Sequence, residues 1–197
     1  MSISYGIYLY DNVANLDYIG PHETFGASLY LQGEGQLFTV AEELRPIISA
    51  TGLQVIPDYT FETAPKIDVL LVPGAMNLES AMQSEKGQAW IKDVSQTTQY
   101  TTAVCTGALI LQKIGLLEGR KATTHWQLIP ELQKDENIKV LPEMRYVRDG
   151  NIVTAQGVSA GIDMALWLIG EIHSPDHARE VRKILQYDPA PPYGAEV

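Results

Sequence analysis

Hydrophobic and polar positions follow two alternating patterns along this chain. Short, nearly continuous apolar runs are typical of strands buried on both faces of a sheet. Such runs occur at residues 3–10, 67–72 and 100–104. Stretches with helical composition lie between or after them, at residues 17–31, 87–97 and 108–113. Strands that alternate with helices predict an α/β fold with a mostly parallel central sheet flanked by helices.

Weaker patterns fill the rest of the chain. Residues 36–41 and 45–49 have strand composition and can form a hairpin, and residues 53–56 follow as another short strand. In the second half, two short strands at residues 122–124 and 138–140 flank a helix near residues 127–133.

The last third of the chain has clearer start and stop signals. Asp149-Gly150 predicts a hairpin turn between strands at residues 145–148 and 151–154. Ser159 is a candidate N-cap for a helix over residues 159–171, with Asp163 in its first turn. Ser174-Pro175 opens a final helix that reaches about Tyr187.

The composition fits one α/β domain over residues 1–197, with an extended Pro-rich tail at about residues 188–197. Hydrophobic residues make up 45% and charged residues 19%, and the formal net charge is −10 without any basic run. Binding to nucleic acid is therefore disfavoured. No signal segment and no apolar run long enough to span a membrane is visible, so we expect a cytoplasmic protein without a membrane partner.

Cys105 is the only cysteine, which excludes an internal disulfide, and no Cys/His spacing suggests a metal site. It stands where the strand at residues 100–104 turns into the next helix. A thiol in the first turn of a helix is near unpaired backbone N–H groups and the positive end of the helix dipole, which favour the thiolate. The alternative is a small buried core residue, since free cysteine is often fully buried.

Three other features fall near the expected carboxyl ends of strands, where ligands bind in parallel sheets. These are Asp17 in the loop after the first strand, Pro73-Gly74-Ala75, and Gln156-Gly157-Val158. Their convergence favours the interpretation of Cys105 as a nucleophile.

Several segments carry a resemblance to a known family. The chain resembles the ThiJ/PfpI superfamily of glutamine-amidotransferase-like folds, and within it the isonitrile hydratases. The superfamily resemblance lies in residues 103–108 (AVCTGA) and 115–126 (GLLEGRKATTHW). The similarity to the hydratases lies in residues 16–23 (LDYIGPHE), 159–163 (SAGID) and 186–193 (QYDPAPPY).

The resemblance implies a flavodoxin-like layered sandwich, a homodimer, and a nucleophilic Cys105 partnered by Asp17 as general acid and base. The implied reaction is hydration of an isonitrile to an N-substituted formamide through a cysteine thioimidate, without a metal or organic cofactor. For Asp17 the alternative role is a helix N-cap. Some superfamily members have a histidine directly after the cysteine, whereas this chain has Thr106, which counts against protease activity.

The remaining candidates have supporting roles. The backbone N–H groups of Thr106 and Ala75 can stabilise an oxyanion, and the Thr106 hydroxyl can contact a ligand or the helix end. Many relatives have a second glycine where Ala75 stands, which makes Ala75 the weaker donor. His125, Glu23 and Gly157 are expected beside the site rather than in contact with the reacting atoms.

Two classes of alternative function share the same cysteine. One is a glyoxalase-like or amidase-like enzyme acting on α-oxoaldehydes or amides. The other is a free-standing ligand or redox sensor, since regulators with a similar sensor domain exist and an exposed thiolate also reacts with peroxide.

Overall fold

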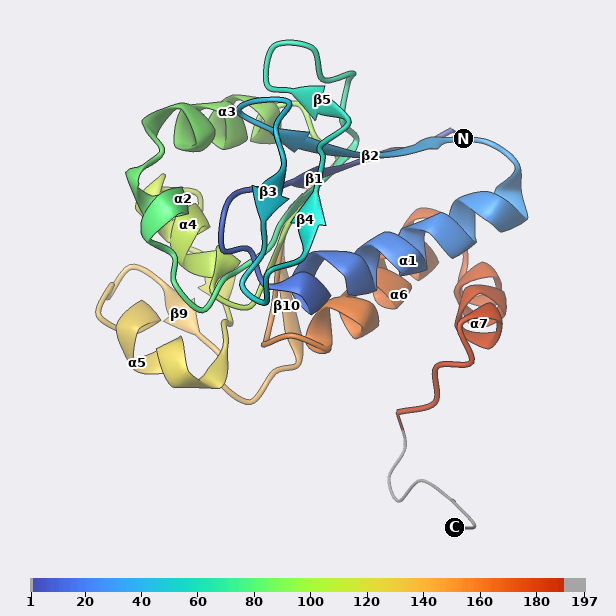
Figure 1. Ribbon diagram of the computed structural model, residues 1–197. Helices are drawn as coiled ribbons and strands as arrows, with labels where there is room; N and C mark the ends of the chain where they lie inside the picture. Colours follow the sequence, from blue (N-terminus) through green and yellow to red (C-terminus); the bar gives the residue numbers. More distant parts are fainter. Residues whose placement is uncertain (1, 190–197) are drawn as a thin grey trace, which may run out of the picture.

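A seven-stranded sheet forms the centre of the molecule in the computed structural model, which describes residues 2–189 (Figure 1). Only the pair β10–β11 is antiparallel, and all other neighbouring strands are parallel. In spatial order the strands are β10 (Tyr146–Asp149), β11 (Ile152–Ala155), β7 (Tyr100–Val104), β6 (Val69–Val72), β1 (Ser4–Tyr8), β2 (Gln36–Ala41) and β5 (Tyr59–Thr60).

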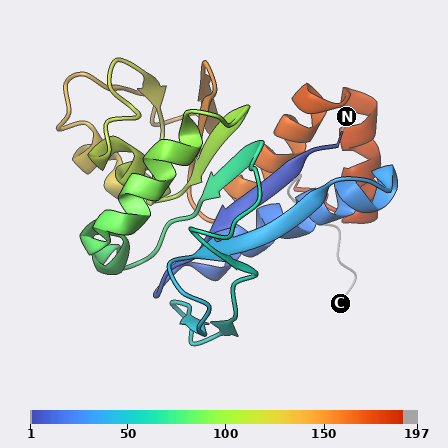
Figure 2. The ribbon, with the colours of Figure 1, turned by 90° about the horizontal axis from the view of Figure 1, so that it is seen from above.

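Helices cover both faces of this sheet (Figure 2). On one face α1, α6 and α7 contact one another, and α2, α3 and α4 lie on the other. The helices are α1 (Asn15–Gln32), α2 (Glu79–Gln83), α3 (Glu85–Ser95), α4 (Gly107–Lys113), η1 (Trp126–Leu128), α5 (Ile129–Leu132), α6 (Ala160–Ile172) and α7 (Pro175–Ile184). Two small sheets pair β3 (Ile47–Ile48) with β4 (Gln54–Val55) and β8 (Lys121–Ala122) with β9 (Lys139–Val140).

Burial explains why the apolar runs became strands. Every residue of β6 and β7 is buried, as expected for the central strands of a parallel sheet covered on both faces. The α/β architecture with a mostly parallel central sheet, predicted from the hydrophobic pattern, is therefore confirmed, and it agrees with the layered sandwich that the family resemblance implied.

Glycines bring α1 and α6 close together beneath this sheet. A Cβ on Gly20 would lie 2.8 Å from Cγ1 of Ile162, and a Cβ on Gly161 would lie 3.0 Å from Cγ of Pro21. Larger residues at these two positions would separate the helices. Their close packing fixes the start of α1 relative to the loop that precedes α6.

Most predicted elements are present, several with the predicted bounds. The strands at residues 36–41 and 100–104 match β2 and β7, and the Asp149-Gly150 turn joins β10 to β11 with a positive φ of 62° at Gly150. Ser174 caps α7 by accepting a hydrogen bond from the N–H of His177, as predicted.

Three local predictions were wrong or incomplete. The segment at residues 45–49 forms no hairpin with β2, because β2 pairs with β1 and β5 while β3 pairs with β4. Ser159 stands at the N-cap position of α6 but makes no capping bond, since its hydroxyl accepts from Nη2 of Arg145. Strand β5 and helix α2 were not predicted, because neither is long enough to show a period.

The predicted Pro-rich tail falls largely outside the described residues. Tyr187, Asp188 and Pro189 follow α7 without regular structure. Residues 190–197 are not described. None of the helices within residues 2–189 combines the length and apolar character needed to cross a bilayer.

The strand order places four loops at one edge of the sheet. The chain leaves β1 toward β2 on one side and returns to β6 on the other, so the switch point lies beside the carboxyl end of β1. The loops after β1, β6, β7 and β11 therefore meet there, as the sequence predicted.

Candidate active site

Cys105 occupies a strained turn between β7 and α4. Its φ is 58°, a left-handed conformation that non-glycine residues rarely adopt. Hydrogen bonds hold it there: its N–H donates to Gln156 O at 3.0 Å and to Ala155 O at 3.2 Å, and its carbonyl accepts from Oγ1 of Thr124 at 2.8 Å. This strand–turn–helix geometry is the one that presents a nucleophile in other α/β enzymes.

Two glycines make room for the turn. A Cβ on Gly107 would lie 2.2 Å from the carbonyl oxygen of Val72, so only glycine lets α4 start this close to the end of β6. A Cβ on Gly74 would lie 2.6 Å from the Thr106 nitrogen and 2.9 Å from Oδ2 of Asp17. The loops after β6 and β7 are thus in van der Waals contact across the site.

Asp17 lies in the first turn of α1 and is fully buried. Its Oδ2 accepts a hydrogen bond from the N–H of Gly74 at 3.0 Å, and its Oδ1 has no partner of normal geometry among the described residues. The Cys105 thiol and the Val158 N–H both donate toward this carboxyl and lower its pKa. The structure therefore brings Asp17 and Cys105 together. The N-cap alternative is wrong, because Ala14 stands at the N-cap and Asp17 lies inside the helix.

The segment before α1 is fixed from two sides. Toward the site, the N–H of Ala14 donates to Gly74 O at 2.9 Å and Val13 forms a β-bridge with Ala75. On the opposite side, the N–H of Asn12 donates to Ile48 O at 2.8 Å. The start of α1, and with it Asp17, is thereby held in register with the loop after β6.

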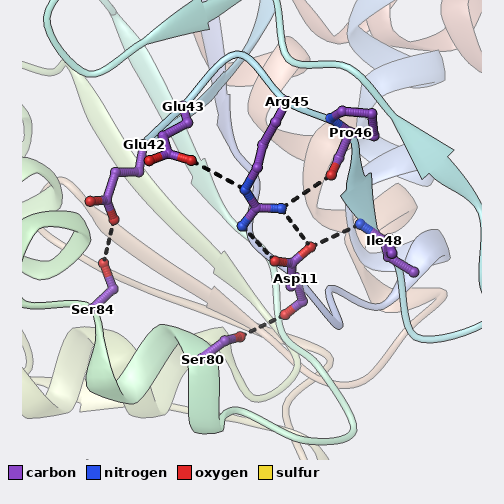
Figure 3. Close-up of polar contacts among 8 residues, drawn as sticks. All are labelled: Asp11, Glu42, Glu43, Arg45, Pro46, Ile48, Ser80 and Ser84. Carbon is purple, nitrogen blue, oxygen red and sulfur yellow. Dashed lines mark hydrogen bonds and ion pairs between the residues drawn. The ribbon is translucent and has the colours of Figure 1, made fainter.

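An ion pair secures the outer contact (Figure 3). Asp11 accepts from Nη2 of Arg45 at 2.6 Å and from the N–H of Ile48 at 2.9 Å, and its own carbonyl accepts from Ser80 Oγ at 2.6 Å. The β3–β4 pair and α2 are thus both attached to the segment that leads to Asp17.

Burial controls the protonation of the Cys105–Asp17 pair. It raises the pKa of Asp17 from 3.8 to about 6, despite the donors from Gly74, Cys105 and Val158. Burial, followed by the negative charge of Asp17, raises the pKa of Cys105 from 9.0 to about 12. At neutral pH the resting pair is therefore a thiol beside a carboxylate. Burial and Asp17 thus shift the pKa of Cys105 in the direction opposite to the one that the N–H groups at the start of α4 favour.

Thr106 and Ala75 bond to each other. The Thr106 hydroxyl donates to Ala75 O at 2.8 Å and accepts from the Ala75 N–H at 2.9 Å. The Ala75 N–H can act on an oxyanion only if this bond is exchanged. The N–H of Thr106 is directed at the Cys105 sulfur, where it lowers the pKa of the thiol.

His125 packs against the loop after β11. A Cβ on Gly157 would lie 2.1 Å from Cδ2 of His125, so Gly157 is the residue that admits the imidazole. The Nδ1 atom of His125 accepts from the N–H of Gln127 at 3.3 Å and caps η1. Glu23 is exposed on α1 and makes no contact with Cys105 or Asp17.

Val158 was expected near the site as part of Gln156-Gly157-Val158, but its role as a backbone donor was not predicted. Its backbone has a φ of 54°, and its N–H lowers the pKa of both Asp17 and Cys105. A β-branched residue gives no sequence signal for such a conformation, which it normally avoids. Within residues 2–189, no group of three or more histidine, cysteine or acidic side chains is arranged to hold a metal ion.

Comparison with known proteins identifies the fold family. A sequence profile of the DJ-1/PfpI family matches residues 5–171. This chain belongs to the DJ-1/PfpI family. It is 40% identical over 196 residues to the isonitrile hydratase of Pseudomonas putida. The aligned residues cover 98% of this chain and 82% of that protein.

Solved structures and regulators extend the DJ-1/PfpI relationship. A ThiJ/PfpI family protein from Pseudomonas syringae is 34% identical, with a TM-score of 0.87 over 100% of this chain and 80% of that one. DJ-1beta from Drosophila melanogaster shares the fold with a TM-score of 0.84 at 21% identity, over 95% and 100% of the two chains. The HTH-type transcriptional regulator GbdR from Pseudomonas aeruginosa is 26% identical over 94% of this chain, which spans about half (51%) of the regulator.

Proposed function

We propose that this chain hydrates isonitriles to N-substituted formamides at Cys105. The observation that carries the proposal is the fully buried Asp17 carboxyl beside Cys105 in a chain 40% identical to an isonitrile hydratase. The proposal includes a homodimer and a cytoplasmic location, which light scattering and cell fractionation test.

The protonation state suits the first step. As sulfur bonds to the terminal carbon of R–N≡C, Asp17 accepts the thiol proton and then delivers it to the same carbon, which has gained the electron pair. The product is the thioimidate R–N=CH–S–Cys105. One proton moves from sulfur to carbon through one carboxyl, so no outside acid is needed.

The second step consumes water. The ionised Asp17 removes a proton from water as the oxygen adds to the thioimidate carbon, and it then passes that proton to the nitrogen. Collapse of R–NH–CH(OH)–S–Cys105 breaks the C–S bond, releases R–NH–CHO and returns the proton to sulfur. The N–H groups of Thr106 and Val158 lower the pKa of Cys105, so they stabilise charge on sulfur in both steps.

The same features argue against a peroxide sensor. Peroxide reacts with the thiolate, and a cysteine whose pKa is raised to about 12 holds little of it at neutral pH. The glyoxalase-like alternative is tested in the same assay by offering methylglyoxal beside a panel of alkyl and aryl isonitriles.

A pair of isosteric variants tests the role of Asp17. Asp17→Asn retains shape but cannot carry the proton, so we expect formamide formation to fall by about 10²–10⁴-fold. His125→Asn is the matched control at a residue that contacts Gly157 rather than Cys105, and we expect a much smaller loss. The reverse result, with His125→Asn inactive and Asp17→Asn nearly normal, would favour a Cys–His hydrolase instead.

The pH profile adds a second readout. Because the carboxylate form of Asp17 must receive the thiol proton, kcat/KM for an isonitrile should rise with pH through about 6 and then level off. A profile that instead rises only above pH 8 would indicate a reaction limited by free thiolate.

A further inference from the structure

A groove beside α6 is lined by neither Cys105 nor Asp17. It has a volume of about 790 Å³ and lies between α6, α7 and β10, and we call it the α6–α7 groove. The lining residues used below are Arg145, Tyr146, Trp167, Arg182, Tyr187 and Pro189.

Aromatic rings form one wall of the α6–α7 groove. Tyr146 and Trp167 are half-buried, and their ring centroids lie 5.4 Å apart. The guanidinium of Arg148 lies 5.9 Å from the Trp167 ring centroid and stabilises its position. The wall is therefore a rigid aromatic surface that water still reaches.

The chain itself runs into this groove after α7. The Tyr187 hydroxyl donates to Oδ1 of Asp163 at 3.0 Å, and Oδ2 of Asp163 accepts from Nε of Arg145 at 2.7 Å. Pro189, two residues later, already lines the groove. The last described residues thus lie against this groove.

We propose that residues 190–197 of the same chain bind in the α6–α7 groove. These residues read Ala-Pro-Pro-Tyr-Gly-Ala-Glu-Val. Pro-rich segments favour the polyproline II helix, and aromatic-lined grooves are the surfaces that bind it. At about 3.1 Å per residue, eight residues span roughly 25 Å, enough to cross a groove of this size.

The charges of the α6–α7 groove and of residues 190–197 are also complementary. The Arg182 side chain lines the groove and makes no hydrogen bond or ion pair among residues 2–189, whereas Glu196 brings a negative charge to the tail. Binding within one chain is favoured because only Ala190 separates Pro189 from Pro191. A segment tethered this closely has a high effective concentration at the groove.

Quenching of Trp167 fluorescence in the full chain tests the occupancy. Trp90→Phe with Trp126→Phe leaves Trp167 as the only tryptophan. Replacing Pro191→Gly, Pro192→Gly and Tyr193→Ser in that background should raise the acrylamide quenching constant about twofold, because a covered aromatic ring becomes exposed. Tyr30→Ser, at an exposed tyrosine of α1, is the matched control and should leave quenching unchanged. Equal quenching with and without the tail substitutions would contradict the proposal.

Cross-linking decides which chain supplies the tail. With Cys105→Ala removing the only cysteine, Ala178→Cys in the groove and Tyr193→Cys in the tail form a testable pair. We expect a disulfide within one chain, seen as a product of monomer mass on a non-reducing gel. A product of dimer mass would show that a second copy fills the groove and would overturn the proposal, as would the absence of any cross-link.

Discussion

The turn at Cys105 and the α6–α7 groove differ in almost every physical respect. At Cys105 the backbone has a positive φ, Gly74 and Gly107 stand where no Cβ fits, and the reactive side chain is only 6% exposed. The groove is built from regular helices and one strand, with exposed arginines and half-buried rings. The turn at Cys105 holds the backbone in a conformation that non-glycine residues avoid, whereas the α6–α7 groove presents an open surface built mainly from regular elements.

This difference determines how each region should respond to substitution. Proton transfer between Cys105 and Asp17 depends on the relative position of two side chains, so a small displacement has a large effect on rate. Docking in a groove depends mostly on a few central contacts surrounded by nearly neutral ones, so the loss of one peripheral group should have a small effect. Four predictions test whether the two regions differ in this way.

Cys105→Ala should abolish isonitrile hydration while leaving the protein folded. Alanine is close to cysteine in volume, so little packing is lost. Formamide release measured by chromatography should fall to the uncatalysed level, and the thermal midpoint should change little. A variant that unfolds, or that retains activity, would show that Cys105 is a core residue rather than the nucleophile.

Gly107→Ala should destabilise the protein and displace the nucleophile. The added Cβ would meet the backbone oxygen of Val72 at 2.2 Å, where no flexible side chain can give way. Overpacking of this kind costs about 1–3 kcal/mol, measured as a shift in the urea midpoint.

Gly26→Ala is the matched control for that substitution. It lies in the interior of α1, and its Cβ would meet nothing closer than Leu37 Cδ2 at 3.7 Å. It should stabilise the protein by about 0.5–1 kcal/mol, because alanine favours the helix. If both variants lose stability equally, steric exclusion at the turn is not the reason for Gly107.

The predictability of the fold follows from the same contrast. Elements with a distinct apolar run or a helical pattern were predicted well, as β7, α1 and α3 show, because burial on one or two faces imposes the hydrophobic pattern. Strand β5 has two residues and helix α2 has five, which is too few for either to show its hydrophobic period. The pairing of β3 with β4 rather than β2 depends on contacts with Asp11 and Asn12, distant in the chain.

The site was predictable in its members but not in its electrostatics. Cys105 and Asp17 were identified from a strand–helix junction and a family resemblance, and the structure places them in contact. The raised pKa of Cys105 was not foreseen, because burial depends on the whole fold. The role of the Val158 N–H was not predicted for a different reason: the sequence gives no sign of the positive φ of this β-branched residue.

Asp17 should make folding stability depend on pH in a defined window. Its pKa is raised from 3.8 to about 6 in the folded protein, so the folded state binds the proton more tightly than the unfolded state does. The resulting stabilisation is complete below pH 3.8 and is lost as pH rises through about 6. A tenfold change in proton affinity corresponds to about 1.4 kcal/mol, which gives about 3 kcal/mol in total.

Asp17→Asn isolates this contribution from those of other carboxyl groups. We expect the unfolding free energy of the unmodified protein, relative to the variant, to fall by roughly 2–3 kcal/mol between pH 4 and pH 7. Urea titrations at several pH values measure it. A difference that is constant with pH would mean that the Asp17 carboxyl is solvated in solution, which the buried pair at Cys105 does not allow.

Of the four predictions, the substitution in the α6–α7 groove should cause the smallest loss of stability. Tyr187→Phe removes the hydroxyl that donates to Asp163 but leaves the ring on the groove wall. Asp163 keeps its bond from Arg145, so no buried group is left unpaired and the loss should be about 1 kcal/mol or less. Tyr30→Phe, at a tyrosine that is 82% exposed, is the control and should have no effect on the urea midpoint.

Isonitrile hydration should be unchanged in both variants, because neither hydroxyl contacts Cys105 or Asp17. A large loss of activity in Tyr187→Phe alone would show that the groove and the turn at Cys105 are coupled through α6, and the two regions would then have to be treated as one site.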